Sequence, residues 1–338
     1  MTNTKRTQRA PLIALVLAAL ALTGDARATT DPSASAAPTV TPDPMAGITV
    51  LRDIAYATVE GEALHLDVYR RSDAGDEPQP VLLFYHGGGW VSGGRRDAVP
   101  EDDARMRGRS REWNKVWPSM LPYVRRGLTL VTADYRLAPK APEPAAIEDA
   151  FRALAWIGRE GRDHGLDPTR VGLAGVSAGG HLALLVGLTE TSGIFFPPKD
   201  LGEPRPTIRG VMDFYGVSDV ADLLVGPNAR PFTSQWIPNG SVSRARRLSP
   251  LTYVHSGAPP ILIIHGDADA VVPYDQSKRL ARALEAAGDR VDLLTIHGAA
   301  HGWFEPSELE QIRAAALRFL ERTKLLAPQP SGPPTPTG

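Results

Sequence analysis

Short apolar runs alternate with longer amphipathic segments over most of the chain. Runs rich in Val, Leu, Ile and Phe predict strands, and several are apolar without alternation, as in strands buried on both faces. These strands are expected at 81–85, 128–132, 171–176, 209–215, 261–264 and 291–296. Helical periodicity marks 144–159, 178–188, 275–287 and 305–324. Alternating strands and helices predict an α/β fold, with a mostly parallel central sheet covered by helices on both faces.

The remaining segments define the expected boundaries. Residues 47–57 and 63–70 are expected to form an antiparallel pair of strands at the sheet edge. Residues 216–250 contain Pro, Gly and Asn with weak periodicity, which indicates either a small cap or an irregular excursion. A single catalytic domain is expected over 47–326. The Pro/Ser/Thr-rich linker 29–46 and the Pro-rich tail 327–338 are expected to be disordered.

The first residues have the pattern of a secretory signal peptide. Lys5, Arg6 and Arg9 precede an apolar run at 11–22, and the small-x-small sequence Ala-Arg-Ala follows at 26–28. The run is shorter than the ~20 apolar residues that a transmembrane helix needs. Removal of residues 1–28 is therefore expected, with no membrane span in the mature chain and a periplasmic or secreted location.

Composition excludes several classes of function. Among 338 residues, Lys and Arg number 37 and Asp and Glu 38, which gives a net charge of −1 and no basic surface for nucleic acid. Cysteine is absent, which excludes disulfides, thiolate metal sites, iron–sulfur clusters and a cysteine nucleophile. Neither a cofactor nor a metal ion is expected.

The clearest chemical motif is G-x-S-x-G at 175–179, which contains Ser177 and Ala178. It follows a predicted strand and begins a predicted helix, the context in which this pattern forms a nucleophile elbow. A serine on such a sharp turn has a strained backbone and an exposed hydroxyl. The alternative is a glycine-rich turn with an ordinary N-cap serine.

A second motif, His-Gly-Gly-Gly-Trp at 86–90, follows the strand at 81–85. Ordering three consecutive glycines costs backbone entropy, so a loop without side chains at this place must serve a purpose. N–H groups without flanking side chains suit an oxyanion hole. The alternatives are a flexible turn or a phosphate loop, although neither G-x-G-x-x-G nor a Walker lysine is present.

A nucleophilic serine needs a histidine base, and the base needs a carboxylate. In the expected chain order Ser, Asp, His, only His297 and His301 follow the candidate acids Asp267 and Asp269. His297 continues a strand and is interpreted as structural, whereas His301 lies in a loop of small residues. The carboxylate of Asp267 could instead accept hydrogen bonds from the N–H groups of its own turn. The residues alone favour Asp269 only modestly.

Five motifs in order resemble the α/β-hydrolase superfamily: HGGGW, DYRLAP (134–139), GVSAGG, HGDADAVVP and AHGWF. The closer resemblance is to hormone-sensitive-lipase-like esterases and to acetyl-xylan and feruloyl esterases. It implies an α/β-hydrolase fold with Ser177, Asp269 and His301 as the catalytic triad. It also implies an oxyanion hole made by the amides of Gly88, Gly89 and Ala178.

The same resemblance indicates structural roles for some neighbouring residues. Asp134 and Arg136 lie in a stretch that braces the oxyanion loop in relatives. Trp90, Trp236 and Trp303 either line a sugar or aromatic subsite or pack in the interior.

The expected function is hydrolysis of short or aromatic acyl esters, such as acetyl or feruloyl groups on carbohydrate. The substrate is then a small-molecule or polysaccharide ester. One alternative is a prolyl-oligopeptidase-type peptidase, but its β-propeller has no counterpart in the roughly 50 residues before the first strand. Another is a catalytically inactive hydrolase-fold binding protein, which an intact Ser–Asp–His set disfavours.

Overall fold

The structure, a computed structural model, describes residues 43–100, 119–202 and 205–328. The predicted signal peptide, most of the predicted linker and nearly all of the predicted tail lie outside these residues. Within the described ranges, no helix combines the length and the apolar character needed to cross a membrane.

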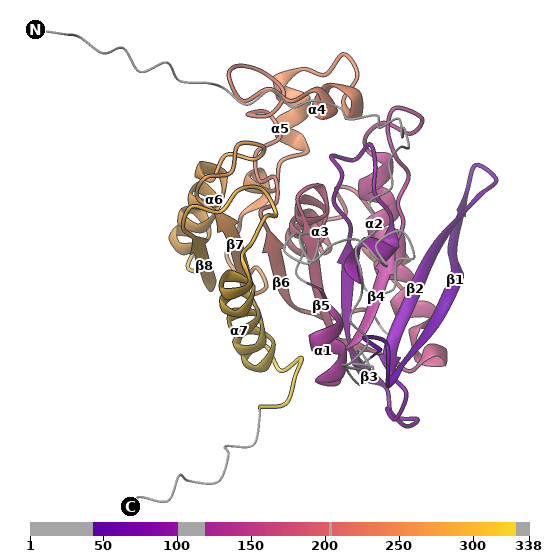
Figure 1. Cartoon of the computed structure of the whole chain (residues 1–338). Coiled ribbons are helices and arrows are strands. Elements are labelled where there is room, and N and C mark those ends of the chain that lie inside the picture. Colours follow the sequence, from indigo (N-terminus) through magenta and orange to yellow (C-terminus); the bar gives the residue numbers. More distant parts are fainter. Residues whose placement is uncertain (1–42, 101–118, 203–204, 329–338) are drawn as a thin grey trace, which may run out of the picture. The chain divides into compact units, whose positions relative to one another are not determined.

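An eight-stranded sheet forms the centre of the domain, in the order β1-β2-β4-β3-β5-β6-β7-β8 (Figure 1). Its strands are β1 (Ile48–Val59), β2 (Glu62–Arg71), β3 (Gln79–Tyr85), β4 (Thr129–Ala133), β5 (Leu166–Val176), β6 (Ile208–Phe214), β7 (Ile261–Gly266) and β8 (Val291–Ile296). β2 pairs antiparallel with β1 and with β4, and all other pairs are parallel. The predicted α/β-hydrolase fold class is confirmed, and the hairpin of β1 and β2 lies at the sheet edge as expected.

Helices cover both faces of the sheet. They are α1 (Leu121–Arg125), α2 (Ala145–Glu160), α3 (Ala178–Thr189), α4 (Pro231–Trp236), α5 (Val242–Arg247), α6 (Asp275–Ala286) and α7 (Pro306–Arg322). Buried residues of α2, α3 and α6 belong to one hydrophobic cluster, and those of α1 and α7 belong to a second. The two clusters occupy opposite faces of the sheet, because successive strand residues point to opposite sides.

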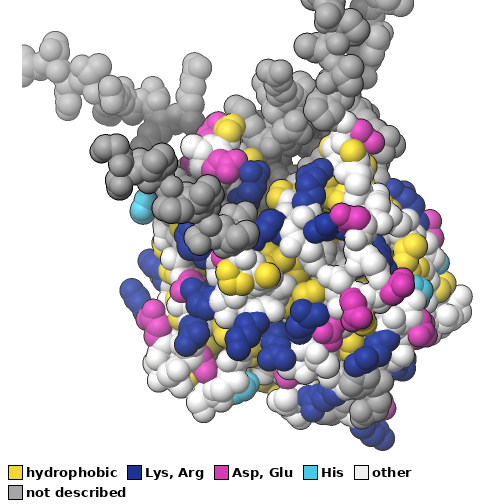
Figure 2. Space-filling view, turned by 90° about the horizontal axis from the view of Figure 1, so that it is seen from below, with side chains coloured by type: hydrophobic (Ala, Val, Ile, Leu, Met, Phe, Trp, Pro, Cys, Tyr) yellow, Lys and Arg dark blue, Asp and Glu magenta, His cyan; other side chains and the backbone are white. Residues whose placement is uncertain are grey.

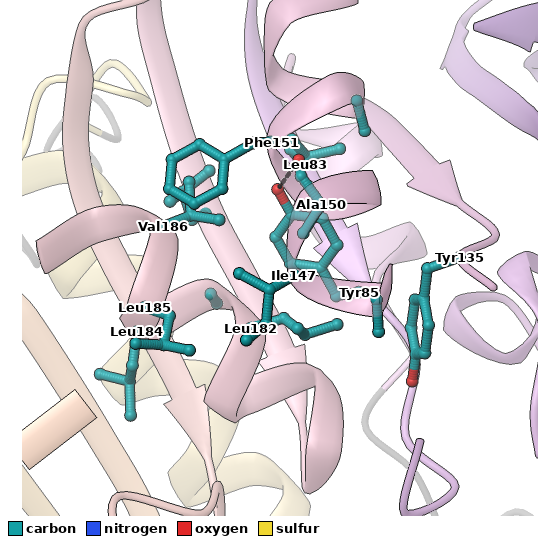
Figure 3. Packing of buried hydrophobic residues seen from close by; sticks show 14 of the residues in the cluster. Leu83, Tyr85, Tyr135, Ile147, Ala150, Phe151, Leu182, Leu184, Leu185 and Val186 are labelled. Carbon is teal, nitrogen blue, oxygen red and sulfur yellow. Dashed lines mark hydrogen bonds between the residues drawn. The ribbon is translucent and has the colours of Figure 1, made fainter. Parts of the chain in front are cut away.

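Strand β3 shows this alternation directly. Leu83 and Tyr85 face the cluster of α2 and α3, whereas Leu82 and Phe84 face the cluster of α7. Figure 3 shows the first cluster, in which the Tyr85 hydroxyl donates a 2.9 Å hydrogen bond to the carbonyl of Ala150 in α2. A buried hydroxyl thus packs among apolar side chains without an unmet hydrogen bond.

The structure differs from expectation mainly in short or irregular elements. β5 begins at Leu166, before the predicted start at 171, because its first residues also pair with β3. A register shift separates this pairing from the one that begins at Val171. α1 was not predicted, and 216–250 is an irregular excursion with two short helices, α4 and α5. Helices of five or six residues are too short to show a periodic pattern, and tertiary packing stabilises them.

Candidate active site

Ser177 lies on the sharp turn between β5 and α3. Its backbone has φ 54° and ψ −119°, a region that non-glycine residues rarely adopt. A Cβ atom at Gly179 would overlap the carbonyl oxygen of Tyr85, and one at Gly175 would overlap the backbone of Gly179. Glycine is therefore required on both sides of the serine, as the elbow interpretation expects.

The structure brings Ser177, His301 and Asp269 together. The Ser177 hydroxyl donates to His301 Nε2 over 2.9 Å, and His301 Nδ1 donates to Asp269 Oδ2 over 2.6 Å. His301 follows β8 and Asp269 follows β7, both at the carboxyl ends of parallel strands. The geometry satisfies the requirement for a nucleophile bonded to a base that a carboxylate orients.

The carboxylate of Asp269 accepts hydrogen bonds from four donors, three of which the sequence did not indicate. Oδ1 accepts the backbone N–H groups of Val271 (2.7 Å) and Val272 (2.9 Å). Oδ2 accepts from His301 and also from His265 Nε2, at 3.1 Å. Burial alone would raise the pKa of Asp269, but hydrogen bonds from the two histidines lower it well below its usual range. The carboxylate is therefore ionised when it meets His301.

The other candidate pair lies beside this one and does not reach the serine. His297 Nδ1 contacts Asp267 Oδ2 at 2.8 Å, and Gly298 N–H donates to Asp267 Oδ1. The His297 side chain is 86% exposed, compared with 17% for that of His301. Asp267 thus bonds the loop that follows β8, and not its own turn as the alternative expected.

Three backbone N–H groups lie free at the predicted oxyanion hole. Among the residues that the structure describes, no protein acceptor binds the amides of Gly88, Gly89 or Ala178. Gly88 and Gly89 have φ values of +106° and +62°, which favour glycine. A tight turn holds the loop, because the Gly88 carbonyl accepts the Ser92 N–H at 3.1 Å. The amide of Ala178 belongs to the positive end of α3.

Tyr135 braces this loop, a role that sequence reasoning did not assign. Its hydroxyl donates to the carbonyl of His86 over 3.0 Å, and its ring stacks on that of His86 at 4.1 Å. Burial lowers the pKa of His86, which stays neutral and donates from Nδ1 to the Gly87 carbonyl. The predicted bracing stretch was right, since Tyr135 lies between Asp134 and Arg136.

The two flanking residues act elsewhere. Asp134 accepts hydrogen bonds from the backbone and the guanidinium of Arg95, just after the glycine loop. Arg136 binds Asp149 in α2 through two hydrogen bonds from its guanidinium, at 2.7 and 3.0 Å, and one from its backbone N–H, at 3.0 Å. Asp134 thus fixes the far end of the loop, whereas Arg136 fixes a helix.

Aromatic packing joins the excursion at 216–250 to the site. The rings of Trp90 and Trp236 stack at 4.0 Å, and both side chains are fully buried. Phe232 packs against Gly89, where a Cβ atom would overlap its ring. In α3, His181 Nε2 donates to the Leu248 carbonyl over 2.7 Å, and burial lowers the His181 pKa to about 4.

Two of the three tryptophans are therefore packing residues rather than an open subsite. Of the three, only Trp303, two residues after His301, is exposed to solvent, at 56%. His181, which is fully buried and bonded to the Leu248 carbonyl, is likewise a packing residue.

Other parts of the described chain offer no competing chemistry. No group of three or more His, Asp or Glu side chains there is placed to hold a metal ion. A groove of about 710 Å³ lies at the amino ends of the strands, at the opposite end of β5 from Ser177. Figure 2 views the molecule from this side, where Lys and Arg are interspersed with Asp and Glu. Four of the groove's five cations (Arg71, Arg126, Arg170 and Arg322) bind carboxylates of the same chain.

Comparison with protein families matches residues 66–284 to the BD-FAE family. Among curated proteins, esterase LipQ of Mycobacterium tuberculosis is 32% identical over 244 residues, which cover 70% of this chain and 53% of LipQ. Carboxylic ester hydrolase LipN of the same organism is 30% identical over 278 residues, 78% of this chain and 68% of LipN. The chain spans about half the length of LipQ and of two similar relatives.

Solved structures with a similar fold include esterase 2 of Thermogutta terrifontis. The apo form has a TM-score of 0.63 and 25% sequence identity, with 84% of this chain and 98% of that chain covered. Further structures of that esterase have bound butyrate or propionate, or are phosphorylated by paraoxon. The likeness covers nearly the whole of the neighbour.

Proposed function

The chain belongs to the BD-FAE family, and from this membership and its assembled Ser177–His301–Asp269 array we propose that it hydrolyses carboxylic esters through an acyl-enzyme. The observation that carries the proposal is the continuous line of hydrogen bonds from Ser177 to Asp269, together with three amides of the glycine loop and α3 that have no acceptor among the described residues. Similarity to carboxylic ester hydrolases of Mycobacterium tuberculosis supports the same activity.

The geometry performs the reaction in two steps. Ser177 Oγ attacks the ester carbonyl while His301 Nε2 takes its proton, and the amides of Gly88, Gly89 and Ala178 hold the oxyanion. Collapse breaks the bond to the alcohol, which leaves with the proton from His301. Water then attacks the acyl-enzyme while His301 takes its proton. Collapse breaks the bond to Ser177 Oγ, which regains that proton from His301 as the acid is released. Asp269 stabilises the imidazolium and stays ionised.

We further propose that the acyl group is short or aromatic, with acetyl or feruloyl groups on carbohydrate as natural candidates. The excursion at 216–250 is fixed by the Trp90–Trp236 stack, and Phe232 narrows the space beside Gly89. Bound propionate and butyrate in the esterase of Thermogutta terrifontis support small acids. The carbohydrate part rests on the resemblance of the HGGGW loop.

The activity is tested with p-nitrophenyl esters from acetate to decanoate, beside methyl ferulate and acetylated xylan. We expect kcat/KM to be highest for acetate to butyrate or for ferulate, and to vanish in Ser177→Ala. A maximum at decanoate would overturn the acyl preference alone. Faster cleavage of aminoacyl amides than of esters would favour the peptidase alternative.

A fluorophosphonate probe tests assembly of the site without any choice of substrate. Wild-type protein is expected to be labelled, and Ser177→Ala is not. Paraoxon modifies the esterase of Thermogutta terrifontis, which supports this probe chemistry. Failure of folded wild-type protein to react would favour the inactive binding protein.

We also propose that the protein is exported to the periplasm or secreted. The basic residues Lys5, Arg6 and Arg9, the apolar run at 11–22 and the Ala-Arg-Ala sequence support this. N-terminal sequencing of exported material is expected to begin at Thr29. Material that retains residues 1–28 outside the cytoplasm would contradict the cleavage site.

A further inference from the structure

A second histidine contacts the carboxylate of Asp269. His265, the penultimate residue of β7, has a fully buried side chain, and its Nε2 lies 3.1 Å from Asp269 Oδ2. This is the same oxygen that His301 Nδ1 reaches at 2.6 Å. We propose that His265 is a positioning residue, which orients Asp269 and limits the negative charge that Asp269 presents to His301. This inference rests on the proposed function.

The surroundings of His265 determine which nitrogen carries hydrogen. Nε2 faces two groups that can only accept, Asp269 Oδ2 and the Val272 carbonyl, both at 3.1 Å. Nδ1 lies 2.7 Å from the buried hydroxyl of Ser277 in α6, which can donate or accept. Nε2 therefore carries a hydrogen in the neutral ring and in the imidazolium alike. Ser277 completes the arrangement by bonding the other nitrogen.

The contact has a geometric consequence for Asp269. Two backbone amides donate to Oδ1 and two histidines donate to Oδ2, so that each carboxylate oxygen accepts two hydrogen bonds. A carboxylate with this many directed contacts has one side-chain orientation, and the acceptor for His301 stays in place. Without His265, Oδ2 would accept a hydrogen bond from His301 alone.

The contact also has an electrostatic consequence. A hydrogen bond from His265 stabilises the ionised form of Asp269, and the pKa of that carboxyl is lowered accordingly. Negative charge that is shared with His265 interacts less strongly with a protonated His301. Loss of the donor should therefore lower kcat through misorientation, and it should also move the acidic limb of the kcat/KM profile to higher pH. A residue that only fills space would not produce the second change.

Other titratable groups face His265 and need control. Asp213 in β6 is buried and interacts with His265 electrostatically, and burial raises its pKa to about 7. The rings of Tyr215 and Tyr274 lie 6.5 and 5.7 Å from the imidazole. Because Asp213 titrates in the range of the assay, the pH profiles are measured both in the native background and with Asp213→Asn.

The test compares three changes along the contact. His265→Leu removes the donor, His265→Gln keeps an N–H near the position of Nε2, and Ser277→Ala removes the partner that bonds Nδ1. We expect His265→Leu to lower kcat by about 10- to 100-fold with little change in KM, by analogy with residues that orient the ligands of a metal ion. Its acidic limb should move upwards by a few tenths of a pH unit. His265→Gln should recover most of both, and Ser277→Ala should fall between.

The matched control is His297→Leu, which removes the exposed histidine bonded to Asp267 and should change neither kcat nor the pH profile. If folded His265→Leu keeps wild-type kcat, or loses kcat without a shift of the limb and without recovery in His265→Gln, the inference is overturned. Absence of ester hydrolysis in wild-type protein would instead reject the proposed function.

A second measurement needs no variant and covers the case in which His265→Leu fails to fold. Long-range ¹H–¹⁵N correlation spectra of the wild-type protein report the hydrogen on each imidazole nitrogen. A hydrogen on His265 Nε2 supports the inference. A neutral ring protonated only at Nδ1 would overturn it, whether or not the protein hydrolyses esters.

Discussion

Two Asp–His pairs lie side by side at the ends of β7 and β8, and only one of them reaches Ser177. Asp269–His301 and Asp267–His297 have similar hydrogen bonds, 2.6 and 2.8 Å long. The side chain of Asp269 is fully buried, whereas that of Asp267 is 33% exposed. Only His301 also contacts a hydroxyl, that of Ser177. A carboxylate–imidazole contact alone therefore does not identify a catalytic base.

Burial makes the difference between the two pairs. Water and salt screen a charge pair at the surface, so that Asp267–His297 can do little to its surroundings. Asp269 lies in an interior where charges interact strongly, and its four donors compensate for the loss of water. The negative charge of Asp269 therefore acts strongly on His301, where it can stabilise an imidazolium.

The largest expected effect comes from removing the group that distinguishes the pairs. Ser177→Ala should lower kcat for p-nitrophenyl acetate by about 10⁶-fold, since the nucleophile is lost while both Asp–His contacts remain. Single-turnover and steady-state assays on folded protein measure this. Near-wild-type turnover in this variant would show that Ser177 is not the nucleophile.

Replacing each aspartate in turn tests directly which of the two pairs supports the reaction. Asp269→Asn should lower kcat by about 10⁴-fold, because the amide favours the wrong tautomer of His301. Asp267→Asn should change kcat by less than about twofold, since its partner His297 does not reach Ser177. Paired kinetics of the two variants at one pH provide the measurement. The reverse ranking would assign the role of the acid to Asp267.

A third buried carboxyl, that of Asp213, shows how hydrogen-bond donors change the pKa of a buried aspartate. The side chain of Asp213 is as buried as that of Asp269, but among the described residues it accepts a hydrogen bond only from the Gly216 N–H, and burial raises its pKa to about 7. Because folding raises this pKa, the native state holds a proton that the unfolded chain has lost, and stability falls as pH rises from about 4 through about 7. Asp269, with a lowered pKa, shows the opposite sign and loses its contribution as pH falls below about 4.

Asp213→Asn should therefore stabilise the fold at about pH 8, on the order of 1–4 kcal/mol, with little change near pH 4. Denaturant unfolding of wild type and variant at the two pH values checks both the sign and the range. An equal effect at both would show that Asp213 does not titrate between them.

The smallest expected effect belongs to the exposed histidine. His297→Ala should leave kcat and KM within about twofold of wild type, because its side chain is solvated and contacts only Asp267. Steady-state kinetics over about pH 5 to 9 test this. A displaced acidic limb in His297→Ala would mean that the exposed pair influences the base after all.

Sequence patterns alone were enough to predict the central strands, the long helices and the two glycine loops. Those features depend on local physics: strands buried on both faces are apolar throughout, and a turn at Ser177 excludes side chains at 175 and 179. Short helices such as α1, α4 and α5 were not predicted, because a single turn has no period to detect.

The choice between Asp267 and Asp269 was not determined locally. Both follow β7 within three residues, both bond a histidine, and the residues alone left the choice open until a family resemblance favoured Asp269. Only the packing of the loops after β5, β7 and β8 decided which carboxylate is buried beside His301. The sequence analysis also did not assign roles to Tyr135 and His265, because each acts through contacts with residues that the fold brings beside it. Such contacts leave no pattern in the chain, since their geometry exists only once the strands have aligned.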